Sequence, residues 1–157
     1  MTKAKKAALI VVSIAFSLFG TIALFWHFGD NYQEFYAVSE EEFYIDGLEE
    51  GFTPQGITYI DSNNQFLTCG YMNDESASRI YVIDASTNKT IKYFTLKLGN
   101  EDYVGHAGGI ATDEKSVWIA GDKKVVRFSY ADMFTIENKG KIEIIDVFSA
   151  PNGADFL

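Results

Sequence analysis

The sequence is poor in cysteine and histidine, and outside the N-terminus it is poor in positive charge. Its single cysteine excludes an intramolecular disulfide and a zinc site built on cysteines. One of its two histidines lies in an apolar N-terminal run, which excludes a multi-histidine metal site elsewhere in the chain. All 22 acidic residues lie from Asp30 onward, and this acidic character argues against nucleic-acid binding. Aromatic residues are abundant, with 13 Phe and 9 Tyr, which argues against disorder.

An uncharged run follows three lysines at the N-terminus. The run covers residues 7–28 and as a helix would be about 33 Å long, enough to span a bilayer core of about 30 Å. Lysines before the run and Asp30 after it predict a cytoplasmic N-terminus and a body outside the cytoplasm. We therefore expect a single-pass protein of the cell membrane, with a cytoplasmic basic tail over 1–6, a transmembrane signal-anchor helix over 7–28 and an acidic tether over 29–42.

A cleaved signal peptide is the alternative to an anchor. The apolar region of a signal peptide usually has about 7–15 residues and ends in small residues of A-x-A type. Here the apolar run continues from Ile22 through Trp26, and no A-x-A pattern follows it. The uncleaved anchor is therefore the favoured interpretation.

Residues 43–157 contain a tandem repeat of short runs rich in β-branched and aromatic residues and separated by turn-forming residues. The first set predicts strands at 54–59, 66–71, 79–84 and 90–96, and the second set at 108–111, 117–121, 125–128 and 141–148. We therefore expect an all-β body of two four-stranded antiparallel sheets, at about 54–98 and 107–149, and the start of a third at 151.

The run SRIYVIDASTNKTIKYFTL at 78–96 resembles a YVTN-type repeat, and PQGIT at 54–58 is similar to the opening of NHL and gluconolactonase-like or strictosidine-synthase-like propellers. The resemblance covers 43–157 and implies β-propeller blades, which stack so that both faces of each sheet are covered. Gluconolactonase-like enzymes hold a divalent metal in the central channel. Those ligands cannot be matched one by one here, and no catalytic motif accompanies the repeat.

The number of repeats is small for a propeller. At about 45 residues per blade, a ring of six or seven blades needs roughly 270–315 residues, so we expect a fragment of a longer propeller. A ring assembled from copies of this chain and a small open domain of two sheets are the alternatives. The unpaired blade faces also predict self-association. Residues 43–45 resemble an outer strand of the kind that completes a last blade.

In a propeller, the loops that enter the first strand and those that join the second strand to the third lie on one rim. Here these loops contain the ligand-binding candidates Gln55, Asn73, Asp74, Glu75, His106, Asp122 and Asn152. His106 is the candidate for acid–base or metal chemistry, because histidine is the side chain most often used for both and this one lies among glycines. The side-chain oxygens of residues 73–75 could bind a divalent metal such as calcium. No cofactor and no defined metal site is predicted.

Three further residues have structural interpretations. Asp61 and Asp113 occupy equivalent turns of the two repeats, so each is predicted to hydrogen-bond within its own turn. Cys69 lies inside a predicted strand, where a buried and unreactive thiol is expected.

Together these patterns predict a membrane-anchored, extracytoplasmic binding or scaffold module for a protein, glycan or small ligand. One alternative is a metal-dependent hydrolase of lactonase or esterase type, similar to gluconolactonase. Another is a truncated product without independent function. The expected partners are the membrane, through residues 7–28, a ligand at the rim and a second copy of the chain, but no nucleic acid.

Overall fold

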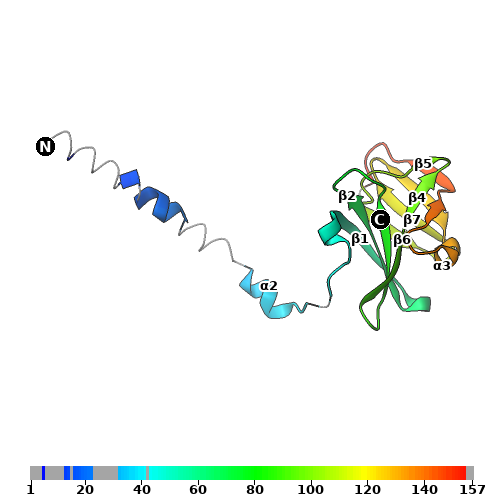
Figure 1. Cartoon of the computed structure of the whole chain (residues 1–157), viewed down its shortest axis with the longest axis horizontal. Helices are drawn as coiled ribbons and strands as arrows, with labels where there is room; N and C mark the ends of the chain where they lie inside the picture. The colour runs from blue at the N-terminus through cyan, green and yellow to red at the C-terminus, as the bar shows by residue number, and fades with distance from the viewer. Residues whose placement is uncertain (1–4, 6–12, 15, 23–31, 42, 155–157) are drawn as a thin grey trace. The chain divides into compact units, whose positions relative to one another are not determined.

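The protein is described by a computed structural model, which covers residues 5, 13–14, 16–22, 32–41 and 43–154. The chain forms two compact units, residues 1–42 and residues 43–157. The first unit contains helical backbone and the second contains the sheets (Figure 1). Each unit is described by itself below.

The described part of the first unit is helical at 13–14 and 16–22, and again in α2 (Gln33–Val38). The Thr21 hydroxyl donates a hydrogen bond of 2.6 Å to the Ser17 carbonyl, one turn earlier. Most of the predicted anchor lies outside the described residues, as do residues 29–31 and 42 of the tether. Among the residues described, no helix reaches the length and apolar character that a bilayer crossing requires.

The body is mostly β, as predicted, and its first sheet is an antiparallel meander that continues into a short fifth strand. The strands in order are β1 (Phe52–Ile60), β2 (Gln65–Met72), β3 (Arg79–Asp84), β4 (Lys89–Leu98) and β5 (Glu101–Asp102). A 3-10 helix, Leu48–Glu50, precedes β1, and another, Asp61–Asn63, joins β1 to β2. Asn64 and Asn88 close two of the turns with positive φ values of 50° and 56°, which asparagine tolerates better than most residues.

The second sheet is also antiparallel, with the spatial order β10-β8-β7-β6. Its strands are β6 (Gly109–Thr112), β7 (Ser116–Gly121), β8 (Lys124–Ser129) and β10 (Asp146–Ser149). The long loop after β8 contains α3 (Asp132–Thr135), whose Met133 is buried. Of the predicted third repeat, residues 151–154 are a turn and irregular backbone, and residues 155–157 lie outside the described part.

The predicted single strand at 141–148 is wrong, because the structure divides it between the two sheets. Its first part, β9 (Lys141–Glu143), pairs in parallel with β4, and its last part, β10, pairs with β8. Ile142 and Ile144 are both buried between the sheets, only 2% and 4% exposed. The change of sheet buries both side chains, and β9 together with the short β5 gives the first sheet six strands instead of the four expected.

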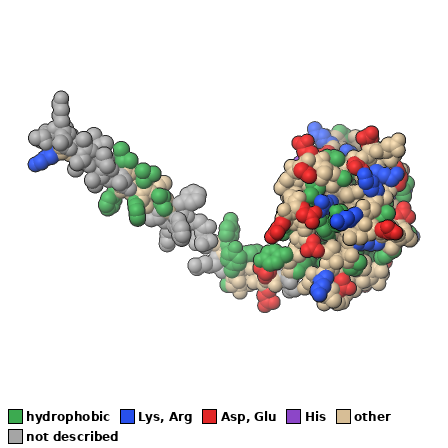
Figure 2. All heavy atoms as spheres, viewed as in Figure 1, with side chains coloured by type: hydrophobic (Ala, Val, Ile, Leu, Met, Phe, Trp, Pro, Cys, Tyr) green, Lys and Arg blue, Asp and Glu red, His purple; other side chains and the backbone are tan. Residues whose placement is uncertain are grey.

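Ion pairs hold β9 against the first sheet. The Lys141 Nζ lies 2.7 Å from an Asp102 carboxylate oxygen, and the Lys97 Nζ lies 2.8 Å from Glu143. Elsewhere on the body, acidic and basic side chains are interspersed over the face shown in Figure 2. Two exposed ion pairs thus accompany the parallel pairing of β9 with β4.

The main core lies between the two sheets. It includes Leu67, Ile80 and Phe94 from the first sheet, and Ile119 and Phe128 from the second. The Phe94 and Phe128 rings meet edge to face, with centroids 5.7 Å apart. Because alternate side chains of a strand point to opposite faces, each sheet contributes one face to this core.

A second, smaller core covers the far face of the first sheet. There Phe43 and Ile45 pack against a group that includes Tyr81 and Ile83. Residues 43–45 have irregular backbone, so their predicted role as an outer strand is wrong for this chain. The Phe43 ring stacks on Phe66 instead, with centroids 6.0 Å apart, which buries apolar surface that would otherwise face solvent.

Candidate functional site

The loops that carry the sequence candidates meet along one edge of the body. We call this edge the rim and define it as residues 51–55, 73–78, 103–108, 122–123 and 150–152. Three backbone hydrogen bonds join neighbouring segments, and a fourth bond, from the His106 amide to the Asp122 carboxylate, joins residues 103–108 to 122–123. The Asn73 amide donates to the Gly51 carbonyl (2.9 Å), the Ser78 amide to Tyr103 (3.0 Å), and the Ala150 amide to Lys123 (2.7 Å).

Ser78 fixes the central rim segment, residues 103–108, to the first sheet. Its hydroxyl donates to the Gly105 carbonyl at 2.7 Å, and the Gly105 amide lies 3.2 Å from the same oxygen. Ser78 is only 1% exposed, so these bonds form away from competing water. Sequence reasoning missed Ser78, because a serine before a strand looks like any other loop residue.

His106 and Asp122 are brought together at the rim. The His106 backbone N–H donates to an Asp122 carboxylate oxygen at 2.9 Å. The imidazole lies against the Tyr71 ring, with centroids 4.7 Å apart and planes inclined by 50°. His106 is exposed and Tyr71 is half-buried. Tyr71 was also missed, because it occupies the end of a strand where an aromatic residue is ordinary.

Two glycines allow the rim segments to approach this closely. A Cβ on Gly121 would lie 1.5 Å from the His106 carbonyl oxygen. Gly105 has a φ of 152°, and a Cβ there would lie 2.1 Å from the Asp122 carboxylate. The glycine-rich sequence around His106 therefore lets the chain's own loops pack together, in addition to leaving the imidazole exposed.

The remaining candidates lie on the rim but form mostly local contacts. Gln55 lies at a bulge of β1 and donates to the Pro54 carbonyl at 3.2 Å. The Asn73 side chain accepts a bond of 3.0 Å from the Thr53 hydroxyl. Hydrogen bonds from the Ser76 hydroxyl and amide lower the pKa of Asp74. Each is exposed apart from these contacts.

Glu75 and Asn152 are exposed and lie in turns, and Glu75 has a positive φ of 60°. No hydrogen bond or ion pair joins either of them to another candidate within the described part of the chain. Across the same residues, no group of three or more His, Cys, Asp or Glu side chains is arranged to hold a metal ion.

The structure supports the predicted roles of Asp113 and Cys69 more fully than that of Asp61. The Asp113 carboxylate accepts bonds from the Ser116 and Lys115 amides, and these bonds lower its pKa, as predicted for a turn residue. In the equivalent turn the Asn64 amide bonds to the backbone carbonyl of Asp61, not to its carboxylate. Cys69 is fully buried, as expected, and burial raises the pKa of its thiol to about 12.

Comparison of the chain with models of known families, with curated proteins and with solved structures gives no match. The arrangement of the rim is therefore the basis for a functional conclusion.

Proposed function

We propose that the chain is a membrane-anchored binding module of β-propeller type, which binds a protein, glycan or small ligand outside the cytoplasm at its rim. The observation that carries this proposal is the group formed by Tyr71, His106 and Asp122. The Tyr71 ring at the end of β2 lies against the His106 imidazole, the Asp122 carboxylate accepts the His106 amide, and the buried Ser78 holds the loop that carries His106. Aromatic rings combined with polar groups on a rigid support suit recognition of polar ligands.

The arrangement of the sheets supports the propeller part of the proposal. Each repeat begins with an antiparallel meander, and the two sheets pack face to face through one apolar core. The first strands β1 and β6 approach closely, since a Cβ on Gly56 would lie 3.0 Å from the Gly109 Cα. Glycines at this crossing agree with strands that converge toward an axis.

The sequence supports the membrane part. Three lysines precede the uncharged run at 7–28, and every acidic residue follows it. This asymmetry is the one that places an N-terminus in the cytoplasm. No specific observation favours the hydrolase alternative, so a binding role is the one we propose.

An experiment on the rim tests the binding role. The full chain in lipid nanodiscs is screened on an array of glycans and on a library of extracytoplasmic peptides. For a probe that binds, we expect Tyr71→Ala and His106→Ala each to weaken binding about tenfold, while the melting temperature stays within about 2 °C. Phe134→Ala is the matched control, because Phe134 is an exposed aromatic residue in the loop after β8, outside the rim.

The proposal fails in two cases. Either no probe binds the wild type, or every bound probe is held equally well by both rim variants. A large loss of melting temperature in His106→Ala would show instead that this residue serves the packing of the loops.

A further inference from the structure

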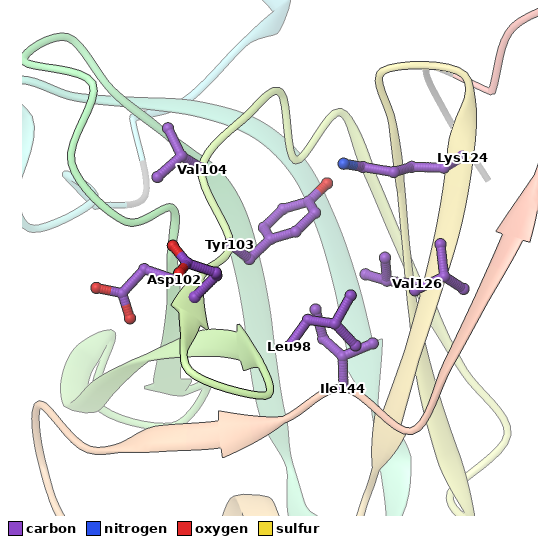
Figure 3. A pocket seen from close by; sticks show the side chains of 9 residues that line it. Leu98, Asp102, Tyr103, Val104, Lys124, Val126 and Ile144 are labelled. Atoms are coloured by element: carbon purple, nitrogen blue, oxygen red, sulfur yellow. The ribbon is translucent and has the colours of Figure 1, made fainter.

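A pocket of about 170 Å³ lies beside the rim, where the end of β4 and β5 face β8 and β10. Figure 3 shows Leu98, Ile144 and Val126 on one side of it. Val104 and Val147 complete the apolar lining. Leu98, Val104 and Val147 are each about half exposed, so the pocket opens to solvent. An apolar wall of this kind favours a hydrocarbon group.

The Tyr103 hydroxyl is the unusual feature of the pocket. Tyr103 is 7% exposed, yet its hydroxyl has no hydrogen-bond partner among the described residues. A buried hydroxyl without a partner is destabilising and therefore uncommon. Burial raises the pKa of Tyr103 well above its ordinary value, and the nearby charge of Asp122 raises it further, so the hydroxyl stays protonated and available as a donor.

Lys124 supplies a positive charge at the same end of the pocket. Its Nζ lies 5.1 Å from the centroid of the Tyr103 ring. In Figure 3 the Tyr103 hydroxyl and the Lys124 amino group point toward each other, at one end of the apolar wall. No carboxylate within the described ranges is ion-paired with Lys124.

The carboxylates near the pocket either bond to other groups or lie at its mouth. Both Asp102 oxygens accept bonds from Lys141, at 2.7 and 2.9 Å. One Asp122 oxygen accepts the His106 amide, and Glu101 is exposed at the mouth. The two groups left at the end of the apolar wall, Tyr103 and Lys124, are both donors.

We propose that this pocket binds a short aliphatic monocarboxylate. One carboxylate oxygen accepts the Tyr103 hydroxyl bond and the other pairs with Lys124, while the hydrocarbon chain lies against Leu98, Val126 and Ile144. A cavity of about 150 Å³ holds a benzene molecule, so a pocket of this size suits an acid of about six carbons. This assignment does not depend on membrane attachment or on a propeller fold.

Binding of hexanoate to the full chain in nanodiscs, measured by saturation-transfer NMR against empty nanodiscs, tests the proposal. We expect saturable binding that Tyr103→Phe and Lys124→Gln each weaken about tenfold, the usual effect of losing a bond to a charged group. Lys115→Gln is the matched control, because it removes the same charge from an exposed turn position that does not line the pocket, and it should leave the dissociation constant unchanged.

The neutral analogue hexanamide distinguishes a carboxylate site from a general apolar pocket, and we expect it to bind about tenfold more weakly. Three results would overturn the proposal: no saturable binding of hexanoate to the wild type, hexanamide binding as tightly as hexanoate, or variants at 103 and 124 that bind like wild type. Folding of each variant is checked by its melting temperature. Tyr103→Phe should melt no lower than wild type, because it removes a hydroxyl that has no partner among the described residues.

Discussion

The absence of a side chain at Gly121 allows two loops of the rim to pack closely. Gly121 lies at the end of β7, directly beneath the His106 carbonyl, and there is no space for a methyl group between them. Residues 106 and 121 are far apart in the sequence, so this requirement arises only in the folded chain. The rim is therefore sensitive to small changes at a position that carries no functional group.

We expect Gly121→Ala to destabilise the body by about 2–3 kcal/mol, because the added Cβ forces backbone atoms apart. Urea unfolding of the full chain in nanodiscs, followed by the fluorescence of Trp118 in β7, measures this change. Lys123→Ala, an exposed change in the same hairpin, should shift the unfolding midpoint little. Equal stability of Gly121→Ala and wild type would contradict the packing described here.

Two aspartates beside turns, Asp84 and Asp113, should make the body less stable in acid. Backbone and hydroxyl bonds from Thr87 lower the pKa of Asp84, and amide bonds from Ser116 and Lys115 lower that of Asp113. A lowered folded-state pKa contributes stability that is present above the unfolded pKa of about 4 and disappears as the pH falls through the folded value. The melting temperature should therefore fall below about pH 4, and less so in Asp84→Asn and Asp113→Asn. Identical pH profiles of variants and wild type would contradict this assignment.

At the scale of elements, β9 is the segment that ties the two sheets together. It follows β8 in the chain but extends the first sheet, and its Ile142 lies in the core between the sheets. Because β9 pairs with the first sheet and its Ile142 packs in the core between the sheets, the two sheets depend on each other. Loss of its anchoring side chain should therefore lower the stability of the whole body, not of one sheet.

Ile142→Ala should destabilise the body by about 3 kcal/mol, as expected for a large-to-small change in a core. Ile145→Ala is the matched control, because Ile145 is 53% exposed, and its effect should be within about 0.5 kcal/mol. Urea unfolding followed by circular dichroism measures both. If the two variants are equally stable, β9 is not anchored as described.

The strands that could be predicted from sequence are those with local signals. Alternating β-branched and aromatic residues between turn residues located β2 and β3 to within about a residue, since both patterns lie within a short window. The division of 141–148 could not be predicted. Its two halves have similar composition, and their choice of sheet depends on partners distant in sequence, such as Asp102. At the rim, the loops could be located, but the contacts of Tyr71 and Ser78 arise only from the packing of segments on one another.

At the scale of the whole molecule, one face of the second sheet lacks the cover that the first sheet has. Trp118, Val125 and Phe148 lie on the face opposite to the core residues Ile119 and Val126. Phe148 is 50% exposed and the other two are partly exposed. The ion-paired Arg127 and Asp146 lie on the same face, which points away from the first sheet.

We expect copies of the full chain to associate through this face. Light scattering of the chain in detergent should show a concentration-dependent oligomer, and Trp118→Glu should shift it toward the monomer by burying a charge in the contact. Phe134→Glu, an exposed aromatic residue elsewhere, is the control and should leave the oligomer intact. A wild type that stays monomeric at high concentration would contradict the prediction.

The charge asymmetry of the chain predicts its orientation in the membrane. Alkaline phosphatase fused after Leu157 should be active, since that enzyme needs an oxidising compartment outside the cytoplasm. Replacing the three N-terminal lysines with glutamate should lower the activity, because the orienting charge is lost. An inactive wild-type fusion, with a cytoplasmic reporter active in its place, would overturn the topology.

The parallel pairing of β9 with β4 also sets an order of events during synthesis. A ribosome completes β4 well before it reaches Glu143, and at about 5–20 residues per second the interval lasts several seconds. Throughout that time the edge of β4 at Thr95 and Lys97 lacks the partner that residues 140–144 supply, and such an edge readily recruits foreign chains. A nascent chain halted before β9 should therefore depend more on chaperones than one that already contains Lys141–Glu143, because β9 closes this edge of the first sheet.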